Sequence, residues 1–227
     1  MIGIIGALTI ETEELISMLT EKKIETISGM DFIRGFIFDK EVVVAKCGVG
    51  KVFAGICAQT MILKYSPDLI INTGVAGGLD RKLNIYDFVI ADSLVQHDMD
   101  TTSIGDPLGM ISGPNIIDIP CSQKLVLTFS RCADRLGIPY HIGKIATGDQ
   151  FISSRESVEQ IVANFGAIAC EMEGAAVAQV CYVNDVDFII IRCLSDMADE
   201  ESSENFLSFS RTAAEKSIKL LLEFLKG

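Results

Sequence analysis

The sequence predicts an α/β fold, a three-layer α/β/α sandwich around a central mixed sheet whose strands are largely parallel. Short apolar runs typical of buried strands alternate with longer segments of helical periodicity, and this alternation produces parallel sheets with helices on both faces. The chain has 227 residues, 49% of them hydrophobic, which is enough for one substantial core. No linker, repeat or low-complexity segment divides it, so we predict a single domain over residues 1–227.

The expected strands are short runs rich in β-branched and aromatic residues, bounded by glycine, proline or polar residues. They span residues 2–8, 24–38, 41–46, 68–72, 88–95, 140–146 and 188–192. The second and third are expected to pair antiparallel around a turn at Asp39 and Lys40, because phenylalanines alternate with other residues along the second. Strand 68–72 is largely apolar, which predicts a central strand buried on both faces.

The expected helices repeat apolar residues at helical spacing. They span residues 11–19, 52–65, 123–136, 171–181 and about 205–225. The fourth is apolar on most sides, yet it opens with Glu171 and Glu173, and buried carboxylates are costly unless they are paired or used. The alternative explanation is that both acids sit in a first helical turn, where the helix dipole stabilises each by about 0.3–1 kcal/mol.

Composition restricts the possible partners. The net charge of -12 opposes binding to nucleic acid or to an anionic membrane surface, and the 19 Lys and Arg residues are scattered. No apolar run approaches the roughly 20 residues needed to span a bilayer. The seven cysteines lie in apolar runs without a C-x-x-C pair, so we expect buried, reduced thiols. No signal-peptide pattern opens the chain, and a cytoplasmic protein is expected.

Three tempting motifs fail on spacing. The run Gly48-Val49-Gly50-Lys51 lacks the four residues between glycines, and the Ser or Thr, of a phosphate-binding loop. The glycine-rich turn at residues 73–78 does not match G-x-G-x-x-G, although its backbone amides can line a small-ligand pocket. The run from His97 to Asp100 has no standard metal-site spacing. We therefore expect neither a metal nor a cofactor.

Chemically useful residues follow the predicted strands. Glu11, the turn at 73–78, Phe151 and Asp196 each lie where a strand ends, and Glu173 enters from a helix start. In open α/β sheets the carboxyl ends of the strands form the ligand-binding crevice. An aromatic ring beside free backbone groups suits a flat ligand that is both stacked and hydrogen-bonded. The sequence thus predicts one small-molecule crevice.

Six segments in this order resemble one known family. They comprise residues 5–7 with Glu11, 48–52, 72–78, 147–152, 171–173 and 192–199. Together they resemble the bacterial 5′-methylthioadenosine/S-adenosylhomocysteine nucleosidases, of the nucleoside phosphorylase/hydrolase superfamily, over essentially the whole chain. The resemblance implies a nucleoside phosphorylase-like fold and a homodimer. It also implies hydrolysis of methylthioadenosine, S-adenosylhomocysteine and 5′-deoxyadenosine to adenine and a 5-substituted ribose, in methionine salvage.

The resemblance also implies roles for the reacting groups. Asp196, held by Ser195, is the acid that protonates a ring nitrogen of adenine, and Glu11 is the base that activates the attacking water. Glu173 binds the ribose hydroxyls, and Met172 packs beneath the sugar. Glycoside hydrolases use a similar pair, in which one carboxyl group stays protonated as the acid and another stays ionised, and the implied roles of Asp196 and Glu11 follow this pattern by analogy.

The remaining residues implied by the resemblance hold the substrate. Phe151 stacks on adenine, whose edge is read by the Ile152 backbone. An apolar pocket for the alkylthio group is lined by Leu8, Val49 and Phe206, and Ile104 reaches in from the other subunit. The set is completed by Arg192, which supports the water and the acids, and by Glu171, Ala76, Gly77 and Val75. Relatives often have a small hydroxyl residue in place of Val75 and Met in place of Leu8, and neither change removes a catalytic group.

Three other functions remain open on the sequence. A phosphorylase of the same superfamily would replace water by phosphate, but phosphate prefers Arg, Lys and hydroxyl donors, and this chain offers Glu11 and Val75 at that place. A hydrolase of the same fold acting on another nucleoside, such as futalosine, is the second. A non-enzymatic nucleoside-binding protein is the third, and it would be expected to lack Glu11, Glu173 or Asp196.

Overall fold

A computed structural model describes the whole chain, Met1–Gly227. The strands are β1 (Ile2–Gly6), β2 (Thr20–Ile27), β3 (Met30–Ile37), β4 (Lys40–Lys46), β5 (Leu69–Gly78), β6 (Phe88–Gln96), β7 (Ile119–Pro120), β8 (Tyr140–Thr147), β9 (Ala169–Glu171) and β10 (Asp187–Asp196). The α-helices are α1 (Thr9–Met18), α2 (Lys51–Tyr65), α3 (Gln123–Leu136), α4 (Arg155–Phe165), α5 (Gly174–Val183) and α6 (Ser202–Leu225). A single 3₁₀ turn, η1, covers Thr102–Ile104.

The strands form one mixed sheet in the order β10-β6-β8-β9-β5-β1-β4-β3-β2. Strand β10 also pairs with β5, so that β5, β10, β6, β8 and β9 close into a ring. The central pairs of β1 with β4 and β5, and of β5 with β10, are parallel, whereas the β2–β3–β4 segment is antiparallel. Because β1, β4, β5 and β10 run in the same direction, the residues that follow or finish them converge at one edge. Strands β8 and β9 run in the opposite direction, and β9 brings its end to this region by pairing with Gly77 and Gly78 of β5.

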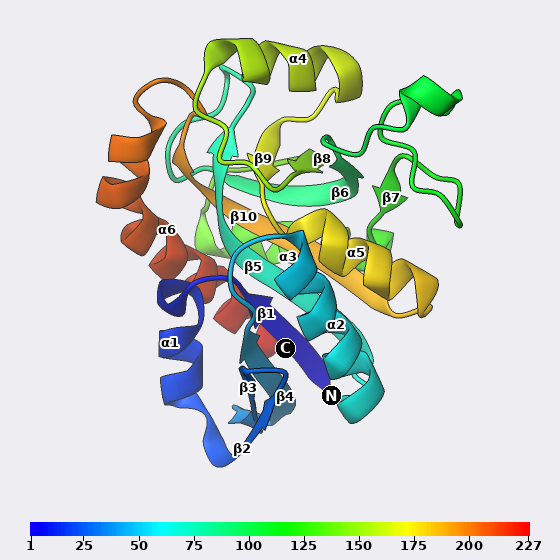
Figure 1. Ribbon diagram of the computed structural model, residues 1–227. Coiled ribbons are helices and arrows are strands. Elements are labelled where there is room, and N and C mark those ends of the chain that lie inside the picture. Colours follow the sequence, from blue (N-terminus) through cyan, green and yellow to red (C-terminus); the bar gives the residue numbers. More distant parts are fainter.

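Helices cover both faces of this sheet (Figure 1). Helices α1 and α3 pack on α6, which lies along β10 and β5, while α2 packs on α5 against the opposite face. Helix α4 lies at the end of the sheet farthest from the β2–β3–β4 hairpins (top of Figure 1). The predicted three-layer α/β/α arrangement around a mixed sheet is confirmed.

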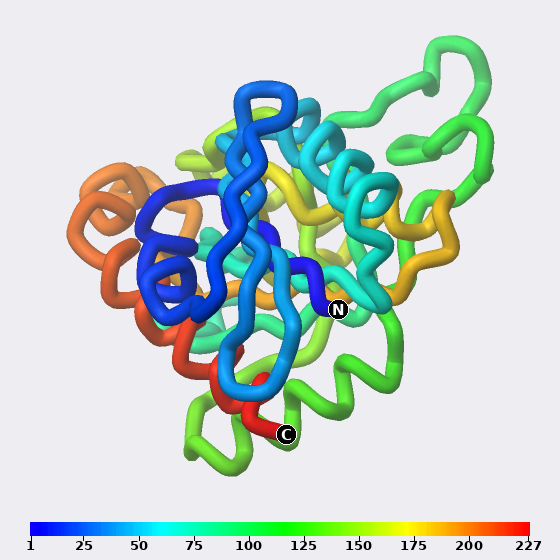
Figure 2. Tube along the Cα trace, turned by 90° about the horizontal axis from the view of Figure 1, so that it is seen from below, coloured from blue at the N-terminus to red at the C-terminus, as the bar shows by residue number.

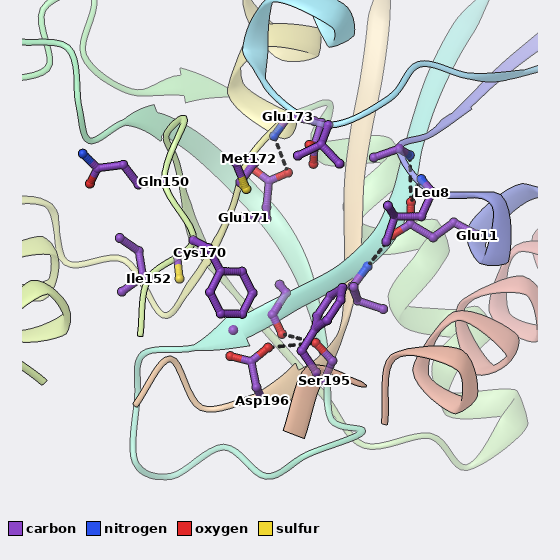
Figure 3. A pocket seen from close by; sticks show the side chains of 17 residues that line it. Leu8, Glu11, Gln150, Ile152, Cys170, Glu171, Met172, Glu173, Ser195 and Asp196 are labelled. Carbon is purple, nitrogen blue, oxygen red and sulfur yellow. Dashed lines mark hydrogen bonds between the residues drawn. The ribbon is translucent and has the colours of Figure 1, made fainter. Parts of the chain in front are cut away.

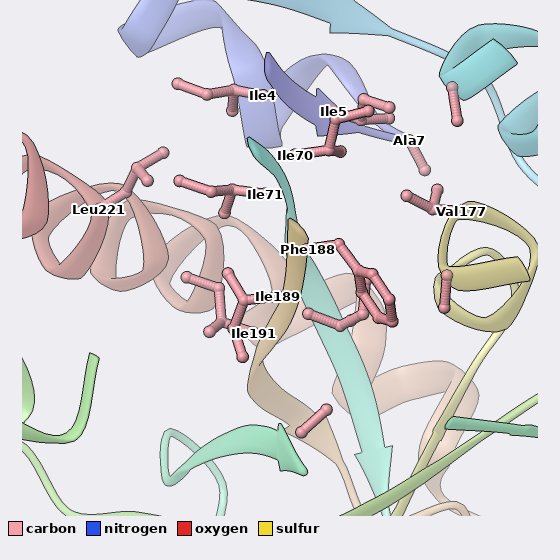
Figure 4. Packing of buried hydrophobic residues seen from close by; sticks show 14 of the residues in the cluster. Ile4, Ile5, Ala7, Ile70, Ile71, Val177, Phe188, Ile189, Ile191 and Leu221 are labelled. Carbon is pink, nitrogen blue, oxygen red and sulfur yellow. The ribbon is translucent and has the colours of Figure 1, made fainter. Parts of the chain in front are cut away.

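The core shows why the strands needed no polar face (Figure 4). Successive residues point to opposite sides of the sheet: Ile71 and Ile189 face Leu221 of α6, while Ile70 and Phe188 face α5. Since helices lie on both sides, every one of these strand residues is buried. One cluster of 54 buried hydrophobic residues runs from β1 to α6, and all seven cysteines are buried and free, as expected.

Several predicted boundaries were wrong, each for a physical reason. The extended segment 24–38 is two strands, because Ser28 and Gly29 both take positive φ and reverse the chain. The segment 73–78, expected to be a turn, continues β5, because its backbone pairs with both β10 and β9. Helix α4 was missed. Its N-cap residue is Ser154, whose side-chain hydroxyl accepts a hydrogen bond from the N–H of Ser157.

The prediction that Glu171 and Glu173 open a helix together was also wrong. Glu171 ends strand β9, and Glu173 is the N-cap residue of α5, with Met172 between them. Likewise Ser195 and Asp196 lie within β10 and not in the loop after it. Only the pairing of β9 and β10 with distant strands, which local sequence does not reveal, fixes Glu171, Ser195 and Asp196 as strand residues.

The segment between β6 and α3, residues 97–122, is a long loop over most of its length. Its residues leave the body of the molecule (green, upper right in Figure 2) and contain only η1, the short β7 and a bridge between Ile111 and Ile116. No helix of the protein combines the length and apolar character needed to cross a membrane. The loop's projection places Ile104 on an exposed surface, with 79% of its area accessible.

Candidate active site

A pocket of about 300 Å³ opens at the carboxyl edge of the sheet (Figure 3). It is lined by residues that finish or follow β1, β4, β5, β8, β9 and β10, together with one residue of α6. They are Ala7, Leu8, Glu11, Val49, Val75, Ala76, Gly77, Gln150, Phe151, Ile152, Cys170, Glu171, Met172, Glu173, Ser195, Asp196 and Phe206. Figure 3 shows Glu11, Glu173 and Asp196 on three different sides of this space. The lining contains no Lys, Arg or His.

Glu11 lies in the first turn of α1 and is held by backbone N–H groups alone. One carboxylate oxygen accepts from Ala7 (2.7 Å) and Leu8 (2.9 Å), and the other from Val75 (3.1 Å). Gly74 must be glycine here, because a Cβ would lie 2.5 Å from the same carboxylate. Burial raises the pKa of Glu11, while the charge of Arg192 and the three N–H donors act against that rise.

Glu173 faces the pocket with much less protein support. One of its oxygens accepts from the N–H of Gly50 at 2.8 Å, and its side chain makes no other hydrogen bond within the chain. Burial and the neighbouring charge of Glu171 raise the pKa of Glu173 to about 8, against the opposing effects of Arg192 and the Gly50 N–H. A second oxygen thus remains free for a ligand donor.

Glu171 has the opposite environment, although it is two residues away. One oxygen accepts from the Thr147 hydroxyl, and the other from Arg192 and from the N–H groups of Glu173 (3.0 Å) and Gly174 (2.7 Å). Arg192 is 2% exposed, and its guanidinium also donates hydrogen bonds to the side-chain and main-chain oxygens of Asn72. The two charges therefore compensate each other inside the protein.

Asp196 reaches the pocket through an irregularity in β10. Leu194 pairs with Ala76 and Asp196 with Gly77, so Ser195 is an extra residue that locally bulges the strand. The Asp196 carboxylate accepts from the Ser195 hydroxyl (2.9 Å) and from the N–H of Ala198 (3.0 Å). Burial raises its pKa despite these two donors.

Two aromatic rings and one unpaired backbone unit form another side of the pocket. Phe151 and Phe206 meet edge to face, with ring centroids 5.7 Å apart. Neither the N–H nor the C=O of Ile152 makes a hydrogen bond within the chain, although its side chain is buried. A flat ligand beside Phe151 therefore finds one donor and one acceptor in adjacent positions.

The structure brings together fourteen of the sixteen residues that the sequence singled out for the site. Arg192 is not in the lining but directly behind it, bound to Glu171. Ile104 is remote from the pocket of its own chain and exposed. The lining residues that sequence reasoning missed are Ala7, Gln150 and Cys170. The first two belong to motifs already quoted, whereas Cys170 gave no signal beyond that of a buried thiol.

The rejected motifs have structural roles. The N-terminus of α2 is already occupied by two carboxylates of the protein, since the N–H of Gly50 donates to Glu173 and that of Lys51 to Asp149 (2.8 Å). These two amides are therefore not available to a phosphate group. Asp98 is engaged by Lys51 at 2.6 Å, and no cluster of three or more metal-ligand side chains is present.

Comparison with known proteins gives a consistent family. The model of the phosphorylase superfamily matches residues 1–226. A 5′-methylthioadenosine/S-adenosylhomocysteine nucleosidase of Shewanella loihica is 40% identical over 99% of this chain and 98% of its own. The solved nucleosidase of Neisseria meningitidis, in complex with methylthio-immucillin-A, is 34% identical, with a TM-score of 0.96 over 99% and 98% of the two chains. Futalosine hydrolase of Helicobacter pylori is 36% identical, with a TM-score of 0.96 over 99% and 97%.

The fold and the pocket thus define a member of the phosphorylase superfamily. Within it, the chain belongs to the family of 5′-methylthioadenosine/S-adenosylhomocysteine nucleosidases.

Proposed function

We propose that this protein hydrolyses the N-glycosidic bond of 5′-methylthioadenosine and S-adenosylhomocysteine, and of 5′-deoxyadenosine, as a single nucleosidase domain over residues 1–227. The products are adenine and the 5-substituted ribose, which places the reaction in methionine salvage. The observation that carries the proposal is the presence of three buried carboxylates, Glu11, Glu173 and Asp196, on separate sides of one pocket. Each has the surroundings that one part of this reaction requires.

Asp196 is the proposed general acid. Adenine leaves as an anion unless a ring nitrogen is protonated, and the donor must hold its proton near neutral pH. Burial raises the pKa of Asp196 in that direction, and the Ser195 hydroxyl fixes one of its oxygens. Phe151 would stack on the purine, while the unpaired N–H and C=O of Ile152 meet its edge. The base is thereby aligned with the proton it receives.

Glu11 is the proposed general base. The three N–H donors fix its carboxylate but leave an acceptor position free on the oxygen that receives only the Val75 N–H, so that a water can be held and deprotonated. Val75 supplies a backbone N–H to Glu11 but no hydroxyl to the water. The water's orientation therefore depends on Glu11 and on the ribose itself.

Glu173 is proposed to bind the ribose hydroxyls with its free oxygen as positive charge develops on the sugar. An ionised carboxylate there stabilises the oxocarbenium-like transition state more than the neutral substrate. Met172 would pack beneath the sugar. The alkylthio group would occupy the apolar part of the pocket, beside Leu8, Val49 and Phe206.

Glu171 and Arg192 are proposed as positioning residues. All four donors on Glu171 come from the protein, and the guanidinium of Arg192 is likewise engaged by Glu171 and Asn72. Arg192 would act on the substrate only through its charge, which opposes the rise in the pKa of Glu11 and of Glu173. Ala76 and Gly77 complete the wall, where a Cβ on Gly77 would lie 2.8 Å from Asp196.

Water, and not phosphate, is the proposed nucleophile. A phosphate dianion would enter a pocket lined by four carboxylates and by no cationic side chain. The amides at the start of α2 are already bound to Glu173 and Asp149. A phosphorylase reaction is thus disfavoured by the charge of the pocket lining.

The test is incubation of the protein with methylthioadenosine, S-adenosylhomocysteine, 5′-deoxyadenosine and futalosine, each with and without phosphate. We expect free adenine and the free 5-substituted ribose from the first three at a rate independent of phosphate. A sugar 1-phosphate would identify a phosphorylase instead. Cleavage of futalosine alone would identify the function of the Helicobacter pylori relative, and binding without turnover would identify a nucleoside-binding protein.

We also propose a homodimer formed through α2. Four exposed apolar side chains lie along one side of that helix, within an arc of about 100° around the helix axis. They are Val52 (71% exposed), Phe53 (53%), Ile56 (39%) and Leu63 (74%). Ile104 on the projecting loop would then reach the alkylthio pocket of the second copy. Sedimentation should give a dimer, and Ile104→Asp should raise KM for methylthioadenosine. A fully active monomer would contradict this proposal.

A further inference from the structure

Three polar side chains outside the pocket join the start of α2 to two strand ends. Lys51 donates through Nζ to Asp98 (2.6 Å) and to Gln96 (3.2 Å), both at the end of β6. Asp149, just beyond β8, accepts from the main-chain N–H of Lys51 (2.8 Å) and donates its own N–H to Asp98 (2.9 Å). These residues, Lys51, Asp98 and Asp149, form a closed triangle of hydrogen bonds, which we call the α2 clamp.

The α2 clamp sits immediately beside the only donor to Glu173. Gly50 precedes Lys51 and takes a φ of +99°, and its N–H points to the Glu173 carboxylate. A Cβ at this position would approach Asp149 to 3.0 Å, so Asp149 packs directly against the Gly50 backbone. The direction of one N–H bond is thus set by contacts that Asp149 makes with two consecutive residues.

The clamp is well organised for a surface feature. Lys51 and Asp98 are each only about one-fifth exposed. Although burial opposes it, the bonds from Lys51 and from the Asp149 N–H hold the pKa of Asp98 below its usual range, so this carboxylate is ionised at neutral pH. Gln96 also donates to Gln179 of α5 (2.6 Å), which connects the clamp to the helix that Glu173 begins.

We propose that Asp149 is a positioning residue: through the α2 clamp it holds Gly50 so that the Gly50 N–H stabilises the ionised form of Glu173. The inference rests on the proposed function only for the statement that this ionised form serves the ribose. It gives a purpose to an exposed acid that does not line the pocket. It also links the loop carrying Phe151 and Ile152, two and three residues further on, to the opposite wall of the pocket.

The predicted consequence is a change in the titration of Glu173. Besides Gly50, the groups that face it are Glu171 and Glu11, which favour its neutral form, and Arg192, which favours its charged form. Asp149→Ala removes the acceptor for Lys51 and loosens Gly50, leaving these three unchanged. Loss of one hydrogen bond to a carboxylate should raise its pKa by about one unit.

Two measurements on the full protein test this. Carboxyl signals of ¹³C-glutamate-labelled protein are titrated by NMR, with the Glu173 signal identified by its loss in Glu173→Gln. The pH profile of kcat/KM for methylthioadenosine is then recorded. Asp149→Ala should shift the Glu173 titration upward by about one unit and lower kcat/KM about tenfold at pH 7, with recovery above the new pKa.

Two variants serve as matched controls. Asp149→Asn keeps an oxygen acceptor for the Lys51 N–H and should restore both readouts to near the wild-type values. Asp39→Ala removes an exposed carboxylate of the β3–β4 turn, 78% exposed, and should change neither. An unchanged Glu173 titration in Asp149→Ala, or an activity loss equal at every pH, overturns the inference. If the wild type releases no adenine, the proposed function fails, while the NMR titration still decides this point.

Discussion

Two regions of the pocket wall use carboxylates in opposite ways. On one side, Glu171 is surrounded by four donors of the protein, including the guanidinium of Arg192 behind the pocket wall. On the other, Glu173 has a single N–H donor and a pKa raised to about 8. The two residues are neighbours in sequence and both are less than 10% exposed. Burial alone therefore does not distinguish the environments of Glu171 and Glu173, whereas the number of protein donors around each carboxylate does.

The largest effect on turnover is expected for Asp196→Asn. Asp196, like Glu173, has few protein donors around its carboxylate. Asparagine keeps the size and a hydrogen-bond donor but cannot transfer a proton. Turnover of methylthioadenosine should fall by about 10²–10⁴-fold in steady-state assays, with the fold intact by circular dichroism. A 5-alkylthio ribose bearing p-nitrophenolate needs less protonation and should lose much less. Near-normal turnover of methylthioadenosine would remove Asp196 from the acid role.

Glu171→Gln should affect stability first, because the Glu171 carboxylate is bound by four donors of the protein. It leaves the buried Arg192 without its closest counter-charge, and breaking a buried pair in this way costs about 3–5 kcal/mol. Denaturant unfolding measures the loss. Since the charge of Glu171 raises the pKa of Glu173, that pKa should also fall in the variant. Unchanged stability would show that the pair is not the structural unit described here.

Glu173→Gln should have the opposite effect on stability. Folding raises the pKa of this acid from 4.5 to about 8, so between these values the folded protein keeps a proton that the unfolded chain releases. Wild-type stability should therefore decline relative to the variant as pH rises from about 5 to 8, by on the order of 3 kcal/mol. Thermal melts of the ligand-free proteins at several pH values test this. Turnover should fall more than substrate binding, and curves that stay parallel across this range would contradict the environment assigned to Glu173.

Phe151→Ala should have the smallest effect. The side chain is 46% exposed and meets Phe206 edge to face, so its loss should change the unfolding free energy little. Loss of an aromatic contact with adenine is worth about 1 kcal/mol, which predicts roughly a fivefold increase in KM. Phe151→Tyr is the control that keeps the ring. A large loss of kcat in Phe151→Ala, with KM unchanged, would argue against simple stacking.

The sequence by itself determined the fold class, because alternation of strand and helix periodicities leaves few arrangements that bury every apolar face. It also located the side of the pocket that follows β1, β4, β5 and β10, since residues after parallel strands must converge at one edge of the sheet. Helix α3 was predicted with its observed bounds, Gln123–Leu136, because Gly137 ends its amphipathic pattern. In the structure Gly137 takes the left-handed conformation that glycine favours after a helix.

Only the tertiary structure decided how these residues divide the chemistry. Pairing with β8 made Glu171 a strand end, and pairing with β5 did the same for Asp196. The bulge at Ser195 directs the Asp196 side chain into the pocket. Arg192, Asn72 and Thr147, from three different strands, gathered around Glu171, while Gly50 alone reached Glu173. Charge and donor count around a carboxylate depend on contacts between residues more than a hundred positions apart in the chain. Local periodicity carries no information about such contacts, and for that reason the sequence located the acids but not their environments.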